Sequence, residues 1–168
     1  MRVIRYETSN EEVTNLTGPV IFLAGPTVRG NQPHLTSWRN EAIDIFNRLG
    51  FKGTLILPEF TDKTESDKGR VELPIWEDNG LKRADCILFW ICRTRELYGL
   101  NTNSEHGYWL AKDPKKLVYG RPDSAFRIQY NDIMWNKVFT ELNEEREIYN
   151  DLEATIKASI YLIQENQK

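Results

Sequence analysis

The sequence predicts an α/β fold of the flavodoxin-like class, a three-layer sandwich around a five-stranded parallel sheet in the order 2-1-3-4-5. Short apolar runs alternate along the chain with segments of helical periodicity, which is typical of βαβ units. The chain has 168 residues, of which 40% are hydrophobic, and this is enough for one core. We therefore expect a single domain over residues 1–168, with its core at about 19–140 and a closing helix at 140–163.

The first strand and the first helix follow an irregular lead-in at residues 10–18. The strand is the apolar run Val20–Ala24, which Gly25 and Pro26 close. The helix starts at Ser37 and ends near Gly50, a residue suited to a C-cap. Spacings of three and four residues give this helix an inward face, formed by Trp38, Ala42, Ile45, Phe46 and Leu49.

The middle of the chain predicts two more strands and a second helix. Residues 54–57 form the second strand, and residues 86–91 form the third and most hydrophobic one. Residues 61–70 are rich in charge and predict a mobile surface loop. Residues 74–83 predict a helix with proline in its first turn.

The last third of the chain predicts two further strands. A helix at about 107–112 precedes the fourth strand at 116–119, a short helix follows at 124–130, and a weak fifth strand lies at 137–139. Thr140 is suited to cap the closing helix. The apolar stripe of that helix predicts core or a subunit interface and consists of Leu142, Tyr149, Leu152, Ile156, Ile160 and Ile163.

Charge and cysteine content exclude several classes of partner. The net charge is −3 and no basic run exceeds two residues, which argues against a nucleic-acid polymer or a membrane as partner. Cys86 and Cys92 flank one extended segment, too far apart to pair. Together with His34 and His106 they show no metal-ligand spacing, so we expect no metal and no cofactor. Without an apolar signal segment or a run of transmembrane length, the expected location is the cytoplasm.

Two loops of unusual composition converge on one cleft if the predicted strand order holds. The switch point then lies between strands 1 and 3, and the loops at 25–31 and 92–105 line it. Glu105 is expected on the first turn of a helix, where the dipole favours its ionised form. Such a carboxylate can attack a sugar carbon or stabilise a cationic one. The alternative is that Glu105 serves only the helix dipole, with Asn103 or Ser104 as N-cap.

The loop after the first strand is a candidate substrate contact. Its glycines permit close approach of the backbone, and its arginine is able to hold an anion. A turn with a solvated arginine is the alternative. The candidate binding residues in this loop are Gly25, Pro26, Thr27, Arg29 and Gly30.

Acidic and aromatic side chains are expected at the same edge of the sheet. Glu59 follows the second strand, and the next helix begins with Trp76 and Glu77 close together. Trp76 could stack on a planar ring, and Glu77 could donate a proton. The alternatives are a solvated Glu59, a core Trp76 and a solvated Glu77. Asp85 precedes the third strand, at the opposite edge, and is expected to be structural.

Seven short motifs occur in order between residues 20 and 130. They are IFLAGPT at 21–27, WRNEA at 38–42, PE at 58–59, WE at 76–77 with Leu81 and Ala84-Asp85, ILFW at 87–90, TNSEHG at 102–107 and VYGRP at 118–122. This ordered series resembles the nucleoside 2-deoxyribosyltransferase family, which includes the deoxynucleotide N-glycoside hydrolases.

The resemblance implies roles for individual residues. Glu105 matches the nucleophile of the family, and Glu77 is the nearest match to the acid that assists at the base. Residues 28–30 are similar to the phosphate-contacting loop of the hydrolases, and Asn103 stands in the nucleophile's motif as a further substrate contact. In this chemistry a carboxylate traps the sugar while a second acid protonates the leaving base. A second base then gives transfer, and water gives hydrolysis.

Two positions depart from the family pattern. Six residues before the nucleophile, the family has an aspartate or a serine that holds the 5′ end of the substrate, whereas this chain has Gly99. The family's strand-1 tyrosine is replaced by Ile21 or Phe22. Glycosidic chemistry is therefore expected to be retained, and the 5′ end of the substrate stays open.

We therefore expect an enzyme that cleaves or transfers the N-glycosidic bond of a small-molecule nucleoside or (deoxy)nucleotide through a glycosyl-enzyme intermediate. Two alternatives stay open: a glycohydrolase of an NAD-type dinucleotide, and a catalytically silent nucleotide-binding module. Family members commonly complete each site with a neighbouring subunit, which implies a homo-oligomer. The segments at 119–122 and 130–131 are expected near that seam.

Overall fold

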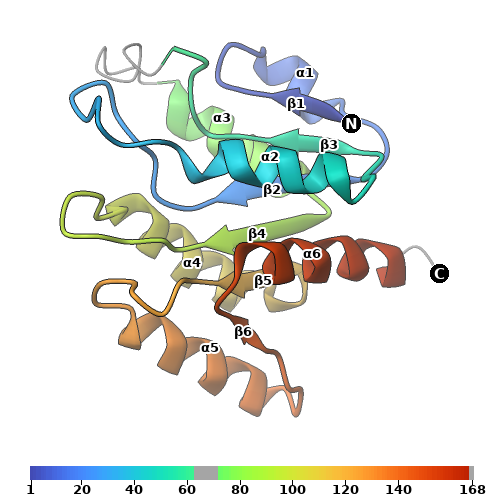
Figure 1. Cartoon of the computed structure of the whole chain (residues 1–168). Coiled ribbons are helices and arrows are strands. Elements are labelled where there is room, and N and C mark those ends of the chain that lie inside the picture. The colour runs from blue at the N-terminus through green and yellow to red at the C-terminus, as the bar shows by residue number, and fades with distance from the viewer. Residues whose placement is uncertain (63–71, 167–168) are drawn as a thin grey trace.

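A six-stranded parallel sheet in the order β1-β3-β2-β4-β5-β6 forms the middle layer of the protein (Figure 1). The computed structural model describes residues 1–62 and 72–166. The strands are β1 (Arg2–Ile4), β2 (Val20–Ala24), β3 (Thr54–Ile56), β4 (Cys86–Trp90), β5 (Leu117–Gly120) and β6 (Ile148–Tyr149). The helices are α1 (Asn10–Thr14), α2 (Trp38–Arg48), α3 (Leu73–Arg83), α4 (Leu100–Lys112), α5 (Gln129–Glu141) and α6 (Leu152–Asn166), with a short 3-10 helix at Pro114–Lys116. The surface loop predicted at 61–70 lies, beyond Asp62, outside the described residues.

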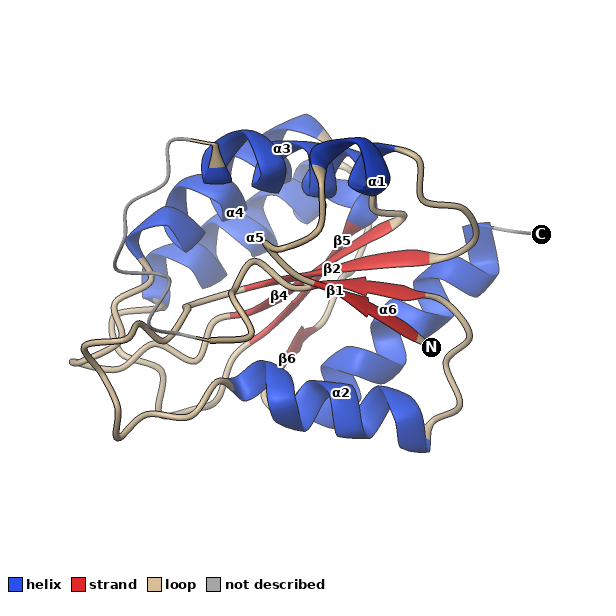
Figure 2. Ribbon diagram, turned by 90° about the horizontal axis from the view of Figure 1, so that it is seen from above, coloured by secondary structure: helices blue, strands red, loops and turns tan. Residues whose placement is uncertain are grey.

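Helices cover both faces of this sheet (Figure 2). α1, α3, α4 and α5 lie on one face, and α2 and α6 lie on the other. The buried side chains accordingly form two clusters: Phe22 of β2 points into the first, and Ile21 and Leu23 point into the second. Every residue of β2 and β4 is buried, as expected for central strands covered on both faces.

The flavodoxin-like class and the predicted order of the first four strands are confirmed. The four predicted runs correspond to β2, β3, β4 and β5, which are neighbours in the order β3-β2-β4-β5. Phe22 of β2 is in register with Ile56 on one side and with Ile87 on the other. The switch point therefore lies between β2 and β4, and their carboxyl ends open on one crevice.

The N-terminal region is more regular than the predicted lead-in. β1 pairs in parallel with β3, and α1 packs against α3 with Ser9 as its N-cap. These elements have only three and five residues, which is too short for a periodic pattern. Packing stabilises them instead, because Ile4 and Val13 are buried in the first cluster.

The fifth strand predicted at 137–139 is wrong, because these residues lie within α5. The buried residues of α5, which are Asn131, Trp135 and Phe139, recur every four positions, and this is the period of a helix. The edge position of the sheet is taken by β6, which pairs Ile148 with Tyr119 of β5.

The closing helix begins later than predicted from Thr140. α5 ends at Glu141, Asn143 adopts a positive φ of 55°, and the last helix, α6, starts at Leu152. Its apolar stripe is core: Leu152 and Ile156 are buried against the sheet, and α6 packs on β4, β5 and α2.

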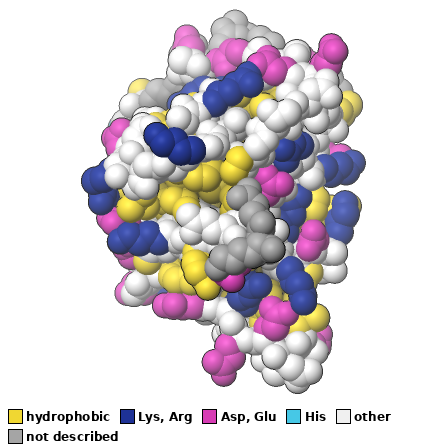
Figure 3. Space-filling model, turned by 90° about the vertical axis from the view of Figure 1, so that its right-hand side faces the viewer, with side chains coloured by type: hydrophobic (Ala, Val, Ile, Leu, Met, Phe, Trp, Pro, Cys, Tyr) yellow, Lys and Arg dark blue, Asp and Glu magenta, His cyan; other side chains and the backbone are white. Residues whose placement is uncertain are grey.

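The surface at the amino ends of the strands carries mixed charge. Figure 3 shows this side, on which acidic and basic side chains are scattered and do not gather into a patch of one sign. Within residues 1–62 and 72–166, no helix combines the length and the apolar character that crossing a membrane requires.

Candidate active site

The loops that follow β2 and β4 meet at the carboxyl ends of these strands, as the strand order predicts (Figure 2). Gln32 Nε2 donates to the carbonyl of Glu96 at 2.6 Å, and His34 Nε2 lies 2.8 Å from the carboxylate of the same residue. Residues 25–37 and 91–99 are therefore in direct contact at one side of the crevice.

Two glycines allow this close approach. A Cβ at Gly25 would lie 2.4 Å from the carbonyl oxygen of Trp90. Gly99 has a φ of 58°, and a Cβ there would lie 2.8 Å from Cγ of Pro26. Both the backbone conformation and the lack of space disfavour any side chain at position 99. The glycine at position 99 is thus required by packing, and this position contributes no side chain to the crevice.

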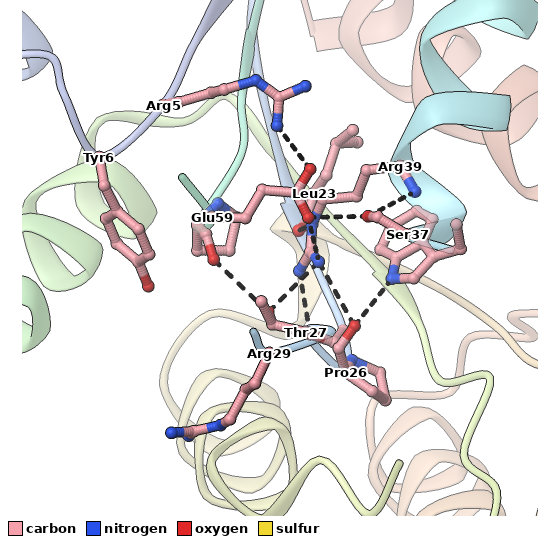
Figure 4. Close-up of polar contacts among 12 residues, drawn as sticks. Arg5, Tyr6, Leu23, Pro26, Thr27, Arg29, Ser37, Arg39 and Glu59 are labelled. Atoms are coloured by element: carbon pink, nitrogen blue, oxygen red, sulfur yellow. Dashed lines mark hydrogen bonds and ion pairs between the residues drawn. The ribbon is translucent and has the colours of Figure 1, made fainter. Parts of the chain in front are cut away.

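A buried arginine ties the loop after β2 to the helix that follows it (Figure 4). Arg39 of α2 is fully buried. Its guanidinium donates to the carbonyls of Leu23 at 3.0 Å and Gly25 at 2.9 Å. It also donates to the Pro26 carbonyl and to Oγ1 of Thr27, both at 3.3 Å. These bonds hold the backbone of residues 23–27 in one conformation, because three carbonyls and the Thr27 hydroxyl are paired with the same rigid group.

Glu59 is enclosed by donors and not solvated. It is 7% exposed, and its carboxylate accepts from Arg5 at 2.5 Å, from Ser37 at 2.7 Å and from Arg39 at 3.4 Å. Since both carboxylate oxygens are engaged, Glu59 organises the loops around the crevice and has little capacity left for a ligand.

Glu77 of α3 and Glu105 of α4 form a hydrogen-bonded carboxyl pair. Burial raises the pKa of Glu77, while hydrogen bonds and the positive charges of Arg39 and Arg29 lower it. Burial together with the charge of Glu77 raises the pKa of Glu105 to about 7, against the opposing effect of Arg39. Two buried carboxyl groups that act on each other in this way cannot both be ionised at low cost, so they share a proton below neutral pH.

The predicted first-turn position of Glu105 is wrong. α4 begins at Leu100, and its N-cap is Gly99 rather than Asn103 or Ser104. The polar residues before Glu105 predicted a loop, but Thr102 is buried and packing outweighs their weak helix propensity. Burial and Glu77, and not the helix dipole, therefore set the ionisation of Glu105.

Tyr6 is a site residue that the sequence did not reveal. Its hydroxyl donates a hydrogen bond to Oε1 of Glu77. Its ring contacts those of Phe60 and Trp76, each at a centroid distance of 4.9 Å. Only the β-branched Val3 and Ile4 before it hint at a strand, and no local pattern connects residue 6 with residue 77.

Arg39 was also missed as a site residue, although a signal exists. Arg39 shares the spacing of Ala42 and Phe46 on the inward face of α2, and a charge on that face indicates a buried partner.

The remaining predicted contacts are placed in different surroundings. Trp76 is 3% exposed, and its Nε1 donates to the carbonyl of Thr8 at 2.8 Å, so it belongs to the core. Asn103 accepts from Nη2 of Arg93. Arg29 is exposed, and its positive charge lowers the pKa of Glu77. Gly30 is the next residue of the same loop. Of these residues, Arg29 is the one that remains available to an anion near the carboxyl pair.

A cavity of about 540 Å³ opens beside Tyr6. Thr27, Ser37 and Glu59 are among the residues that line it, and its volume is in the range of small-ligand sites. The carboxyl pair does not line the cavity. Tyr6 joins the two, because it lines the cavity and donates to Glu77.

Metal-ligating side chains do not gather anywhere in the described part of the chain. No group of three or more His, Cys, Asp and Glu residues among residues 1–62 and 72–166 could hold a metal ion. Cys86 and Cys92 are free thiols, and burial raises the pKa of Cys92 to about 11.

A family model described as "Nucleoside 2-deoxyribosyltransferase like" matches residues 18–124, well over half of the 168 residues. The matched range includes Arg39, Glu59, Glu77 and Glu105, and it begins after Tyr6. The chain matches no curated protein at a significant level.

Proposed function

The chain belongs to the nucleoside 2-deoxyribosyltransferase-like family, and from this premise we propose that it cleaves or transfers the N-glycosidic bond of a nucleoside or deoxynucleotide. Glu105 is the nucleophile, and Glu77 is the acid. The observation that carries this proposal is the hydrogen-bonded carboxyl pair, which lies past the carboxyl ends of the central strands. Two carboxyl groups, one ionised and one protonated, are what glycosidic cleavage requires.

A proton shared between Glu77 and Glu105 lets the pair supply both the ionised nucleophile and the protonated acid. We place this proton on Glu105 in the free protein, because the bond between the carboxyls raises the pKa of Glu105 and lowers that of Glu77. Its transfer along the hydrogen bond leaves Glu105 anionic and Glu77 protonated. The Glu105 carboxylate then attacks the anomeric carbon, the C–N bond breaks with its electron pair on the base, and Glu77 gives its proton to the base nitrogen.

The second half of the reaction resolves the glycosyl ester. Water, or the nitrogen of a second base, attacks the anomeric carbon and releases the Glu105 carboxylate. The Glu77 carboxylate accepts the proton that the attacking atom loses, so the pair returns to its one-proton state. Water gives hydrolysis, and a base gives transfer.

Arg29 is the proposed contact for the 5′ end of the substrate. It is exposed at the crevice, and its positive charge acts on Glu77. Gly99 has no side chain to offer, so the cation in the loop after β2 takes the role of binding a 5′-phosphate in this proposal.

Incubation with nucleosides, deoxynucleotides and dinucleotides, followed by chromatography of the free base, tests the proposed function. We expect base release from a nucleoside or deoxynucleotide. If the dinucleotide is the only substrate that is cleaved, and nicotinamide is released from it, the result would favour the dinucleotide glycohydrolase. Saturable binding without any base release would favour a silent nucleotide-binding module.

Glu77→Gln should slow substrates with poor leaving bases more than substrates with activated ones. Proton donation contributes most when the leaving group is weak, and a loss of about 10²–10⁴-fold is typical for an acid of this kind. Rates across a series of bases of graded pKa measure the effect. Equal losses along the series would mean that Glu77 only packs or positions.

The same variant should change the pH profile of kcat/KM. In the wild-type protein we expect the rate to fall above about pH 7, where the pair loses its shared proton. In Glu77→Gln, the charge that raises the pKa of Glu105 is gone, so Glu105 ionises at lower pH. The alkaline fall near pH 7 should then disappear.

Self-association through α4 and α5 is the proposed assembly. These helices pack side by side, and their outer faces expose Leu100 and Tyr108 on α4 and Tyr130 and Ile133 on α5. Tyr119, expected near the seam, is instead buried. Exposed apolar side chains on adjacent helices are typical of an interface between copies.

We expect light scattering at micromolar concentration to give at least twice the mass of one chain. Ile133→Glu should lower this mass, because it places a charge in the proposed interface. Tyr161→Glu, at a 62% exposed position on α6, is the matched control and should leave the mass unchanged. A fully active monomer would contradict the proposal.

A further inference from the structure

The N-terminal segment, residues 1–17, lies outside the family match and nevertheless reaches the carboxyl pair. β1 pairs with β3, and the amide of Tyr6 donates to the carbonyl of Glu59 at 3.3 Å, just past the end of β3. On the other side, Nε1 of Trp76 on α3 donates to the carbonyl of Thr8. The segment is therefore attached both to the loop after β3 and to the helix that carries the acid.

Tyr6 is held in a defined orientation between these two elements. Its ring lies 4.9 Å from the rings of Phe60 and Trp76, and these contacts leave little freedom for its side-chain torsions. From this position its hydroxyl donates to Glu77, while the residue lines the adjacent cavity. A ligand in that cavity would touch the residue that contacts the acid.

We propose that Tyr6 is a positioning residue for the carboxyl pair, whose hydroxyl orients Glu77 toward Glu105 and sets the pH range in which the pair keeps one proton. The catalytic part of this inference rests on the proposed function. The orientation of Glu77 by Tyr6 and the effect of Tyr6 on the titration of the pair do not depend on any reaction.

The direction of the effect follows from the groups that face the pair. Tyr6, Arg29 and Arg39 face Glu77, and Arg39 also acts on Glu105. A hydrogen bond donated to a carboxylate favours the charged form, so Tyr6 lowers the pKa of Glu77. Burial and the charge of Glu77 raise the pKa of Tyr6 itself, so the phenol stays a donor at working pH. Removal of the hydroxyl should therefore move the loss of protons from the pair to higher pH.

Tyr6→Phe isolates this effect, because it keeps both ring contacts and removes only the hydroxyl. Carboxyl ¹³C NMR of protein labelled at glutamate follows the titration without substrate, and spectra of Glu77→Gln and Glu105→Gln assign the two signals. We expect the titration of the pair to move upward by about one pH unit in Tyr6→Phe. Tyr161→Phe, on the opposite face of the sheet, should leave it in place.

Kinetics provide a second readout. The alkaline fall of kcat/KM should move upward in Tyr6→Phe by the same amount as the NMR titration. An unchanged titration would overturn the inference, and so would a uniform loss of rate with an unshifted pH profile, since a purely structural residue gives that result. If the wild-type protein releases no base from any substrate, the proposed function fails, while the NMR shift still decides the role of Tyr6.

Discussion

Glu105→Gln is expected to abolish base release and to leave the fold intact. Glutamine preserves the shape of the side chain and can still donate a hydrogen bond to Glu77, but it has no anionic oxygen to attack the anomeric carbon. Covalent participation contributes far more than about tenfold to a rate, so a variant that keeps more than about a tenth of the wild-type rate would show that Glu105 is not the nucleophile. Glu145→Gln, on the exposed loop between α5 and β6, should keep the wild-type rate.

The same substitution should change how stability depends on pH. The pKa of Glu105 rises from 4.5 to about 7 on folding, so the folded state holds a proton that the unfolded state has lost. The contribution of Glu105 to stability is therefore complete below about pH 4.5 and is lost as the pH rises through 7. Urea denaturation measures the free energy of unfolding at pH 5 and at pH 8. We expect this free energy to fall less between the two pH values for Glu105→Gln than for the wild-type protein. An identical loss in both would mean that Glu105 is not the group that titrates.

Arg39→Met is expected to lower the free energy of unfolding by about 3–5 kcal/mol. The substitution keeps a long side chain, but it removes the donor shared by the carbonyls of Leu23 and Gly25 and leaves Glu59 with fewer partners in a buried place. Buried polar groups that lose their partner are costly because water cannot replace it. Equilibrium urea denaturation, monitored by tryptophan fluorescence, measures the change.

Arg48→Met on the same helix is the matched control for this prediction. Arg48 pairs with Glu153 at 2.8 Å on the surface, where its side chain is 59% exposed. Exposed pairs of this kind contribute about 0–1 kcal/mol. Equal effects of the two substitutions would contradict the role assigned to Arg39, because they would show that its buried bonds add nothing beyond a surface ion pair.

The central strands are predictable from the sequence because they are buried on both faces. The runs Val20–Ala24 and Cys86–Trp90 are continuously apolar, which is sufficient to identify a covered strand, and the helices between them imply parallel pairing. The N-cap at Ser37 and the left-handed Gly50 after α2 are also local signals, since each depends on residues within one turn.

The edges of the sheet are not predictable in this way. β1 and β6 have three and two residues, and each exists because a partner strand, β3 or β5, is already in place. At residues 137–139 a strand was predicted and a helix is present. Their apolar side chains suggested a strand, but Phe139 continues the four-residue spacing of Asn131 and Trp135 and belongs to α5. Short elements carry too few residues for a pattern to distinguish a strand from a helix.

The sequence by itself predicted Glu105 as a nucleophile and Glu77 as an acid, and it predicted that the loops after β2 and β4 converge. The tertiary structure alone decided that the two carboxyl groups act on each other, that Glu105 stays protonated up to about pH 7, and that Tyr6 and Arg39 act on the pair. The reason is physical: a pKa depends on burial and on the distances to nearby charges and donors. Here these groups come from the segment after β1 and from α2, α3 and α4, and the periodicity of any one segment contains no information about the distances between them.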